Sequence, residues 1–370
     1  MRYQVCIVGG GLAGLALAID LQKRGIQVLV IEKGNYPRHK VCGEYISMES
    51  FNYLHEICPN LIDWRLPHMS QFKLTSTGIL EFKTTLDLGG FGISRHLLEE
   101  LLFNEAKKQG VQFMLLTKAL AVIVNDHDYQ VNTASGNFLA DIVCIATGRK
   151  SNVKSKADKG LQQGTNYIGF KYHVKLKRDT NFIEIHNFPG GYCGVSGIED
   201  DKTCICYIVN AQKLKRVNNS ITELEKTVLN QNKHLKKIFN AAQFLFKEPL
   251  SISGINFNIK RPVEDDTFYL GDAAGCIAPV TGNGMSMALR SASVLAKQLD
   301  SYFHKNISKA ELIENYAAFW DHEFATRVKH SRYFQKLSEY PVFSNVSIGL
   351  FKTFPGLAAR AIGQTHGQPF

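Results

Sequence analysis

The sequence lacks the signatures of several protein classes. None of its eight cysteines is spaced as CxxC and none of its twelve histidines belongs to an HExxH pattern, so neither a zinc ribbon nor a zinc protease is indicated. Several cysteines lie inside apolar runs, where a reduced thiol acts as a small hydrophobic side chain, and this favours a reducing compartment. The uncharged run Val5–Ile19 is about five residues too short to span a bilayer and contains three consecutive glycines. We therefore interpret it as folded structure rather than a signal peptide and predict a cytoplasmic location.

The composition is that of a globular protein. Apolar residues make up 45% of the 370 residues and charged residues 21%, which excludes a disordered, collagenous or coiled-coil chain. The net charge of +10 favours anionic partners such as nucleotide phosphates or an anionic membrane surface. Because no recognition module accompanies the lysine-rich stretches Lys213–Arg216 and Lys233–Lys237, we interpret them as a solvated helix surface and predict no nucleic-acid partner.

Hydrophobic patterning predicts a βαβ unit at the N-terminus, with strands at Tyr3–Val8 and Gln27–Ile31 and a helix at Leu12–Arg24. Two further strands are expected near Phe72–Thr75 and Leu80–Lys83. Between about residues 160 and 260 the pattern changes to alternating, strand-like stretches, which predict an antiparallel sheet. The fold class is therefore α/β with a second, mostly antiparallel sheet.

Later segments complete this organisation. A lysine-rich helix is expected at Ile221–Phe239, a strand at Thr267–Leu270, helices at Gly284–Leu299 and Lys309–Arg327, and a more apolar end at Val342–Ile362. The first domain is then discontinuous, spanning residues 1–160 plus 262–300, with part of 65–95 free to join the second sheet. The second domain covers 161–261, and 301–370 forms a C-terminal helical segment.

A glycine motif carries the first functional signal. Gly9-x-Gly11-x-x-Gly14 lies between the predicted strand and helix, where the glycines permit a tight turn, close approach of a pyrophosphate, and close packing of helix on strand. Glu32 ends the second strand, where a carboxylate accepts hydrogen bonds from ribose hydroxyls. The pattern predicts a dinucleotide site. The acid disfavours NADP there, and NAD and FAD both stay open.

A second glycine-rich segment distinguishes between these cofactors. Gly271–Gly275 and Thr281–Met285 precede a helix, so the chain supplies a second helix N-terminus for a charged or flat group. This stretch resembles the GD motif of FAD-dependent oxidoreductases of the glutathione-reductase-type (GR2) Rossmann superfamily. In that superfamily the Asp binds the ribityl chain, and the following helix points its positive end at the flavin. The resemblance implies FAD.

Other motifs point to the same group. Tyr36–Glu44 is similar to the PRxKxCG segment shared by geranylgeranyl reductases, flavin halogenases and related monooxygenases. Ile93–Arg95 resembles the element with the flavin-contacting Arg, and Ala146–Gly148 resembles the ATG element near the nucleotide. The motifs and the resemblance imply these cofactor-binding residues: Gly9, Gly11, Ala13, Gly14, Glu32, Lys33, Arg38, Cys42, Gly43, Arg95, Ala119, Gly148, Asp272, Gly282, Asn283, Gly284 and Met285.

The sequence also departs from these relatives. Geranylgeranyl reductases carry an aromatic Y-x-W-x-F-P segment where this chain has Gly191–Ser196, and halogenases carry W-x-W-x-I-P, whereas this chain has only Trp64 and Trp320. Aromatic hydroxylases usually have Asp-Gly where this chain has Thr147-Gly148. Halogenation is therefore disfavoured, and prenyl reduction and the usual hydroxylase mode of NADPH binding are both in question.

These observations define the expected function. We predict an FAD-dependent oxidoreductase acting on a lipophilic or aromatic small molecule, a monooxygenase with NADH or NADPH as donor. The alternatives are a reductase of isoprenoid double bonds and a flavin-binding electron carrier. Cys42 and Glu44 are the candidate catalytic residues, although Cys42 has no resolving cysteine nearby and packing against the cofactor is favoured.

Two points concern metals and membranes. Cys204 and Cys206 share a strand face, but no His or acid stands at suitable spacing, so no metal site is predicted. The apolar C-terminal end has two interpretations, a helix pair that caps the core and a peripheral membrane contact.

Overall fold

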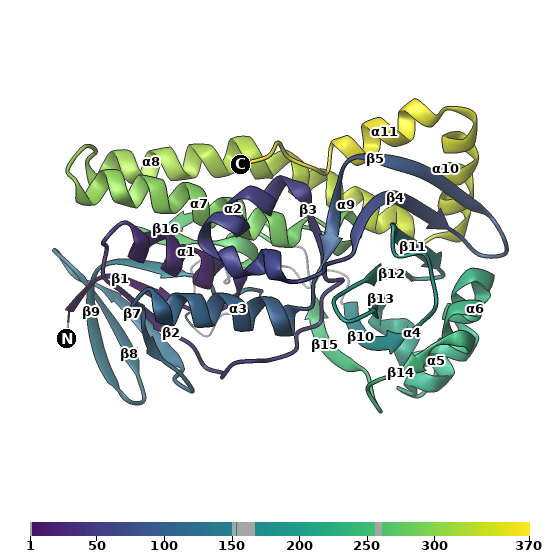
Figure 1. Ribbon diagram of the computed structural model, residues 1–370, viewed down its shortest axis with the longest axis horizontal. Coiled ribbons are helices and arrows are strands. Elements are labelled where there is room, and N and C mark those ends of the chain that lie inside the picture. The colour runs from purple at the N-terminus through teal and green to yellow at the C-terminus, as the bar shows by residue number, and fades with distance from the viewer. Residues whose placement is uncertain (1, 150–152, 154–166, 256–260) are drawn as a thin grey trace.

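A computed structural model describes residues 2–149, 153, 167–255 and 261–370 of the chain. Figure 1 shows an elongated molecule with one β-sheet at each end and long helices along its upper side. The predicted α/β class with two sheets is confirmed. The division into domains stays a prediction, and its boundary at 160/161 lies outside the described residues.

The first sheet has a parallel centre with strand order β16-β17-β9-β1-β2-β6. Parallel pairing joins β17, β9, β1, β2 and β6, while β7 and β8 extend the sheet from β9 in antiparallel fashion. Parallel strands bring their carboxyl ends to one edge, where ligands bind in such sheets. The strands are β1 (Arg2–Val8), β2 (Val28–Ile31), β6 (Gln112–Met114), β7 (Ala119–Val124), β8 (Tyr129–Thr133), β9 (Gly136–Ile145), β16 (Val263–Glu264) and β17 (Thr267–Tyr269).

Helices cover both faces of this sheet. The predicted N-terminal βαβ unit is confirmed, and its helix α1 (Leu12–Lys23) is buried from Leu12 to Leu21 between the sheet and the helices α3 (Arg95–Lys108) and α7 (Gly284–Phe303). On the other face, Trp320 and Phe324 pack against the sheet. The remaining helices of this half are α2 (Phe51–Ile57) and α8 (Lys309–Trp320).

The second sheet is antiparallel except for the parallel pair β4 and β11, with the order β14-β10-β13-β12-β11-β4-β5-β3 and β15 beside β10. Helices α4 (Ala211–Arg216), α5 (Ile221–Thr227) and α6 (Lys233–Ala241) cover one face, and the other face looks toward the first half. The strands are β3 (Tyr45–Ser47), β4 (His68–Thr75), β5 (Glu81–Gly92), β10 (Tyr167–Lys175), β11 (Phe182–Phe188), β12 (Gly191–Gly197), β13 (Lys202–Asn210), β14 (Gln243–Phe244) and β15 (Leu250–Ile255).

The predicted single helix at Ile221–Phe239 is wrong. The side chain of Asn232 accepts hydrogen bonds from the amides of His234 and Leu235 and so caps a new helix, α6. Its amide nitrogen donates to Thr75 Oγ1 and to the Asn187 carbonyl, which fixes the break against the second sheet. Asn232 is completely buried, and this network explains why a polar residue interrupts the helical pattern.

Three other boundaries differ from the sequence prediction. Strand β5 continues to Gly92, well past Lys83, because it pairs with both β4 and β3. The helix expected to end at Arg327 passes through a π-helical turn, Asp321–Ala325, and continues as α9 (Thr326–Ser338). The apolar end forms two helices, α10 (Pro341–Thr353) and α11 (Pro355–Gly363), each with proline in its first turn.

Candidate functional site

The glycine turn between β1 and α1 is sterically specified. Gly9 has a φ of +106°, and a Cβ there would lie 2.6 Å from the Ala146 carbonyl oxygen at the end of β9. A Cβ on Gly14 would lie 2.0 Å from the Gly9 carbonyl oxygen. The turn therefore brings backbone amides and the positive end of α1 to the carboxyl edge of the first sheet.

Glu32 lies at the same edge, at the end of β2. Its carboxylate accepts hydrogen bonds from the Gly10 amide at 2.7 Å and the Gly34 amide at 2.8 Å, and Arg38 Nη1 lies 2.6 Å from it. Burial acts to raise the pKa of the Glu32 carboxyl, but Arg38 and the two amides outweigh it and lower that pKa. Glu32 is thus held ionised beside the glycine turn.

A buried ion network extends this charged region toward α3. Glu99 has no solvent exposure and contacts Arg38, Lys40 and Arg95, with Arg38 Nε and Lys40 Nζ each 3.0 Å away. These cations outweigh the effect of burial and lower the pKa of Glu99 to about 2. Glu99 is thus the centre that orients three cations along the cavity.

The segment Cys42–Glu44 is clamped between the two sheets. Glu44 has a φ of +55°, and its carboxylate lies 2.6 Å from Lys171 Nζ and 2.6 Å from His173 Nε2, both on β10. It also accepts a hydrogen bond from the Arg95 amide at 2.8 Å. Burial alone would raise the pKa of Glu44, but His173 and Lys171 outweigh it and bring that pKa to about 2. The second sheet therefore fixes a loop that belongs to the first half.

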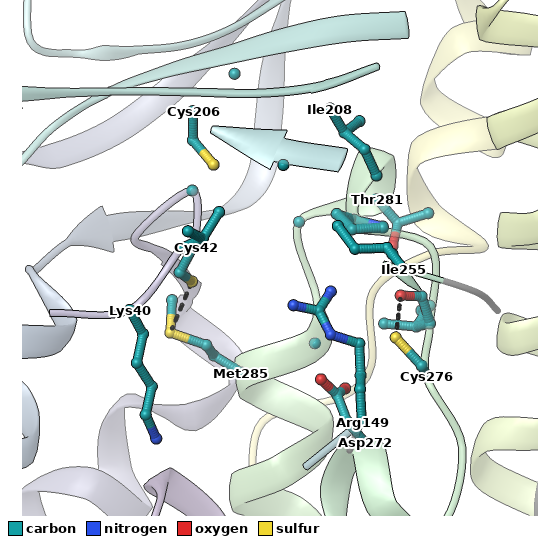
Figure 2. Close-up of a pocket in the computed structure, with 18 of the residues that line it drawn as sticks. Lys40, Cys42, Arg149, Cys206, Ile208, Ile255, Asp272, Cys276, Thr281 and Met285 are labelled. Carbon is teal, nitrogen blue, oxygen red and sulfur yellow. Dashed lines mark hydrogen bonds between the residues drawn. The ribbon is translucent and has the colours of Figure 1, made fainter. Parts of the chain in front are cut away.

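Further contacts complete the clamp around Cys42. Ser196 Oγ donates to the Gly43 carbonyl at 2.8 Å, and Cys204 Sγ lies 3.4 Å from the Cys42 carbonyl oxygen. The Cys42 thiol lies 3.7 Å from the Met285 sulfur at the start of α7 (Figure 2). Cys42 and Met285 thus lie in contact within the wall of the cavity, although 243 residues separate them in the sequence.

The second glycine-rich segment contacts this loop at Met285 and borders the same cavity. Gly282 adopts a φ of +70°, and α7 begins at Gly284 without a side-chain cap from Asn283. Figure 2 shows Asp272 and Arg149 side by side across the cavity from Lys40 and Cys42. The start of α7 therefore presents open amides and a positive helix end to the cavity.

One cavity of about 1130 Å³ is bordered by the glycine turn, Glu32, the loop Cys42–Glu44 and the start of α7. This volume exceeds the ~300–1,000 Å³ of a typical single-ligand site. Its far end is lined by the second sheet and the C-terminal helices with apolar side chains: Phe72, Leu74, Phe82, Leu86, Ile183, Ile185, Tyr192, Ile208, Ile252, Ile255, Phe343, Phe351 and Ile362. The cavity thus has a charged half rich in backbone amides and an apolar half.

Most predicted residues border this cavity. Gly14 and Asn283 do not, because Gly14 packs on the turn and the Asn283 amide donates to the Thr365 carbonyl. The lining set comprises Gly9, Gly11, Ala13, Glu32, Lys33, Arg38, Cys42, Gly43, Glu44, Arg95, Ala119, Gly148, Asp272, Gly282, Gly284 and Met285.

Sequence reasoning missed Arg149, Lys171 and His173. Arg149 follows the ATG element directly, and this position is the only signal for it. Lys171 and His173 occupy alternate positions of an otherwise apolar strand, a pattern that places both on one face.

Glu44, His173 and Cys204 form the one group of described residues whose possible metal-ligating atoms lie within 4.8 Å of one another. Because these three residues are far apart in the sequence, their spacing did not indicate that they come together. Their atoms already serve other bonds, since Glu44 binds Lys171 and His173, and Cys204 contacts the Cys42 carbonyl. The contacts therefore describe a hydrogen-bonded ion cluster.

Comparison with known families decides the cofactor class. A family model described as FAD binding domain matches residues 2–328. The chain belongs to this family. It is an FAD-dependent oxidoreductase, and the resemblance stated from the motifs is confirmed.

The individual relatives of this chain share only low sequence identity with it. Digeranylgeranylglycerophospholipid reductase 3 of Methanosphaera stadtmanae is 23% identical over 360 residues, covering 89% of this chain and 85% of that protein. Ubiquinone hydroxylase UbiM of Neisseria meningitidis is 24% identical, covering 86% of this chain and 73% of that protein. The solved structure of PqsL from P. aeruginosa with 2-aminobenzoylacetate has a TM-score of 0.78 at 18% identity, covering 95% of this chain and all of that chain. This structural likeness shows the shared fold.

The residues present fit FAD. The glycine turn leaves no room for side chains at Gly9 and Gly14, and both helix starts offer amides. The Thr147 hydroxyl, next to the ATG glycine, is buried against the cavity with no hydrogen-bond partner among the described residues. A bound polar ligand would satisfy it.

None of the helices in the described part of the chain is long and apolar enough to cross a bilayer.

Proposed function

We propose that this FAD-dependent oxidoreductase hydroxylates a lipophilic or aromatic small molecule and takes its electrons from NADH or NADPH. The observation that carries the proposal is the single cavity that joins the charged, amide-rich half to an apolar half under α10 and α11. An apolar chamber that opens directly onto a cofactor site suits a greasy substrate that must be kept from water.

The cofactor-binding roles follow the geometry. Amides of the glycine turn and the positive end of α1 would hold the pyrophosphate, and Glu32 the ribose. Asp272 would hold the ribityl chain, with the start of α7 beside the ring. Bound FAD accepts two electrons and delivers them to oxygen or to a double bond. The positive end of α7 at Gly284 and Met285 would stabilise negative charge near the ring.

The chain also has polar groups for orienting a substrate. Tyr45 and Asn187 border the cavity, and the Tyr45 hydroxyl and Asn187 Oδ1 are buried without hydrogen-bond partners among the described residues. The Asn187 amide nitrogen is held by Ser344 at 2.8 Å, which leaves Oδ1 as the acceptor. The free Asn187 Oδ1 in the apolar half suits a molecule with one polar group on an apolar body, for example a phenol, and this favours hydroxylation over reduction of a plain hydrocarbon.

Glu44 and Cys42 have positioning roles in this proposal. The Glu44 carboxylate is bound by Lys171 and His173, so it anchors the loop rather than donating a proton. The Cys42 thiol contacts Met285 and would pack against the cofactor.

A reductase of isoprenoid double bonds is the second candidate. The length of the apolar half, which runs from β4 and β5 to α11, favours it, and an extended chain would fit such a space.

The test is anaerobic mixing of the flavin-loaded protein with NADH or NADPH, with and without a panel of phenols and prenyl lipids. Bleaching that a phenol accelerates, followed by oxygen-dependent hydroxylation, supports the proposal. Consumption of an alkene without oxygen supports the reductase. Flavin that neither nicotinamide reduces, with any panel member, contradicts both and favours an electron carrier.

A further inference from the structure

The C-terminal helices carry an unusual surface. Nine of the nineteen large apolar side chains that are exposed in the described part of the chain lie between residues 333 and 357. We call seven of them the outer face: Tyr340, Val342, Phe343, Val346, Leu350, Phe354 and Leu357. Large apolar side chains exposed together on two neighbouring helices are typical of an interaction site.

Helix α10 shows why this surface is not ordinary core packing. Val342, Val346 and Leu350 follow one another at intervals of four residues and are 71%, 54% and 47% exposed. The opposite side carries the buried Ser344 and Ile348. A helix on a water-facing surface normally reverses this pattern and exposes its polar residues.

The charge of the same region identifies the partner. Residues 326–370 contain one acid, Glu339, whose carboxylate accepts hydrogen bonds from Tyr167 and Asn210. Five exposed basic side chains lie on the two helices of this region and on α9, which packs against α10: Lys329, Arg332, Lys336, Lys352 and Arg360. Exposed apolar side chains among basic residues match the surface of an anionic bilayer, where the apolar groups enter the headgroup region and the cations meet lipid phosphates.

The position of the helices connects this surface to the cavity. Phe351 and Ile362 line the apolar half from the same two helices that carry the outer face, and Phe343 belongs both to the outer face and to the cavity wall. Figure 1 shows α10 and α11 at one end of the molecule, beside the hairpin of β4 and β5. Only this helix layer therefore separates the cavity from whatever covers the outer face.

We propose that the outer face binds an anionic lipid bilayer and that the lipophilic substrate enters the cavity from the lipid through this helix layer. The entry route rests on the proposed function, whereas bilayer binding can be measured without any turnover.

The experiment is co-sedimentation of the flavin-loaded full chain with vesicles of equimolar phosphatidylcholine and phosphatidylglycerol. We expect binding that weakens with added salt and is weaker with pure phosphatidylcholine. The double variant Val346→Glu with Leu350→Glu should weaken vesicle binding by at least about tenfold, because two apolar groups no longer enter the bilayer. The matched control is Leu120→Glu with Ile123→Glu on β7, at sites 53% and 43% exposed, which should bind like the unmodified chain.

Flavin content should be unchanged in both double variants. The proposal is overturned if the unmodified chain does not sediment with either vesicle, or if both pairs of substitutions weaken binding equally. It is also overturned by a different pattern in size-exclusion chromatography. In that pattern the unmodified chain is a dimer, and the outer-face double variant is a monomer that binds vesicles like the unmodified chain. Vesicle binding without turnover of any panel substrate would refute the proposed function alone.

Discussion

The Lys171 ammonium lies 2.6 Å from a carboxylate oxygen of Glu44, and neither side chain has any exposure to solvent. Glu44 belongs to the loop that borders the cavity, and Lys171 to the central part of the second sheet. A pair this deeply buried is costly to form and costlier to break, so it makes the position of the loop dependent on the second sheet.

Removal of Glu44 should destabilise the protein strongly. Glu44→Ala leaves the Lys171 charge without a partner, and we expect the free energy of unfolding in urea at neutral pH to fall by about 3–5 kcal/mol. Adding Lys171→Met should restore part of this loss. Arg2→Ala, which breaks the exposed pair with Asp141, should cost far less, because water and salt screen an exposed ion pair. Equal losses of unfolding free energy in Glu44→Ala and Arg2→Ala would contradict a strong contribution of the buried Glu44–Lys171 pair to stability.

His39 should make stability depend on pH. Burial lowers the pKa of His39 to about 4, and the nearby Lys171, His96 and His173 act in the same direction against Glu44. In the unfolded chain this pKa is about 6.5. The contribution to stability is therefore complete above about pH 6.5 and is lost as the pH falls toward 4.

The His39→Gln variant isolates this contribution. Between about pH 6.5 and 4, its free energy of unfolding should fall less steeply with decreasing pH than that of the unmodified chain. The exposed control His127→Gln should keep the original slope. Identical slopes in all three proteins would show that His39 titrates normally.

A methyl group at Gly14 should disrupt the nucleotide site. Its Cβ would lie 2.0 Å from the Gly9 carbonyl oxygen, so the turn or the helix start must move. We expect Gly14→Ala to weaken FAD binding at least about tenfold, or about 1.4 kcal/mol, measured by flavin titration of the apoprotein. Gly349→Ala, with open space around the added methyl, should bind FAD normally. Full flavin affinity in Gly14→Ala would argue against this turn as the pyrophosphate site.

Gly194 offers a way to separate substrate binding from flavin binding. It borders the cavity on β12, and a Cβ there meets only ordinary contacts, at 3.7 Å from the Cys206 carbonyl oxygen and 3.8 Å from Ile185. Gly194→Ala should therefore keep the flavin content and the substrate KM of the unmodified chain. The larger Gly194→Leu should fill the chamber and raise the KM for the substrate about tenfold or more, since overpacking costs ~1–3 kcal/mol.

Flavin content and reduction by the donor without substrate should stay unchanged in Gly194→Leu. Steady-state kinetics and stopped-flow bleaching provide the two readouts. A loss of flavin without a change in KM would place Gly194 in the cofactor half instead.

The sequence predicts the local parts of this protein well. The first strand, glycine turn and helix follow from the short apolar run and the spacing of Gly9, Gly11 and Gly14, which specify their structure within a few residues. The alternating stretches expected between about residues 160 and 260 include strand β10, whose apolar residues alternate. Such features depend on neighbours close in the chain.

Features that depend on distant partners escaped prediction. The sequence around Lys171 gives no sign that its carboxylate partner lies 127 residues earlier. Likewise, nothing local to Asn232 shows that Thr75 and Asn187 occupy its amide and so split a regular helical pattern. The apolar positions of α10 indicated a helix, but the burial of Ser344 and exposure of Val346 depend on how the helix docks.

The clamp on Glu44 has a consequence for dissecting the molecule. Its carboxylate is held by Lys171 and His173 from one sheet and by the Arg95 amide at the start of a helix on the other. A fragment that ended before β10 would keep the glycine turn, Glu32 and the Arg95 amide, yet its Glu44 carboxylate would lose both of its side-chain partners. Neither half is a self-sufficient module, and excising or grafting the nucleotide-binding part alone should yield a colourless piece.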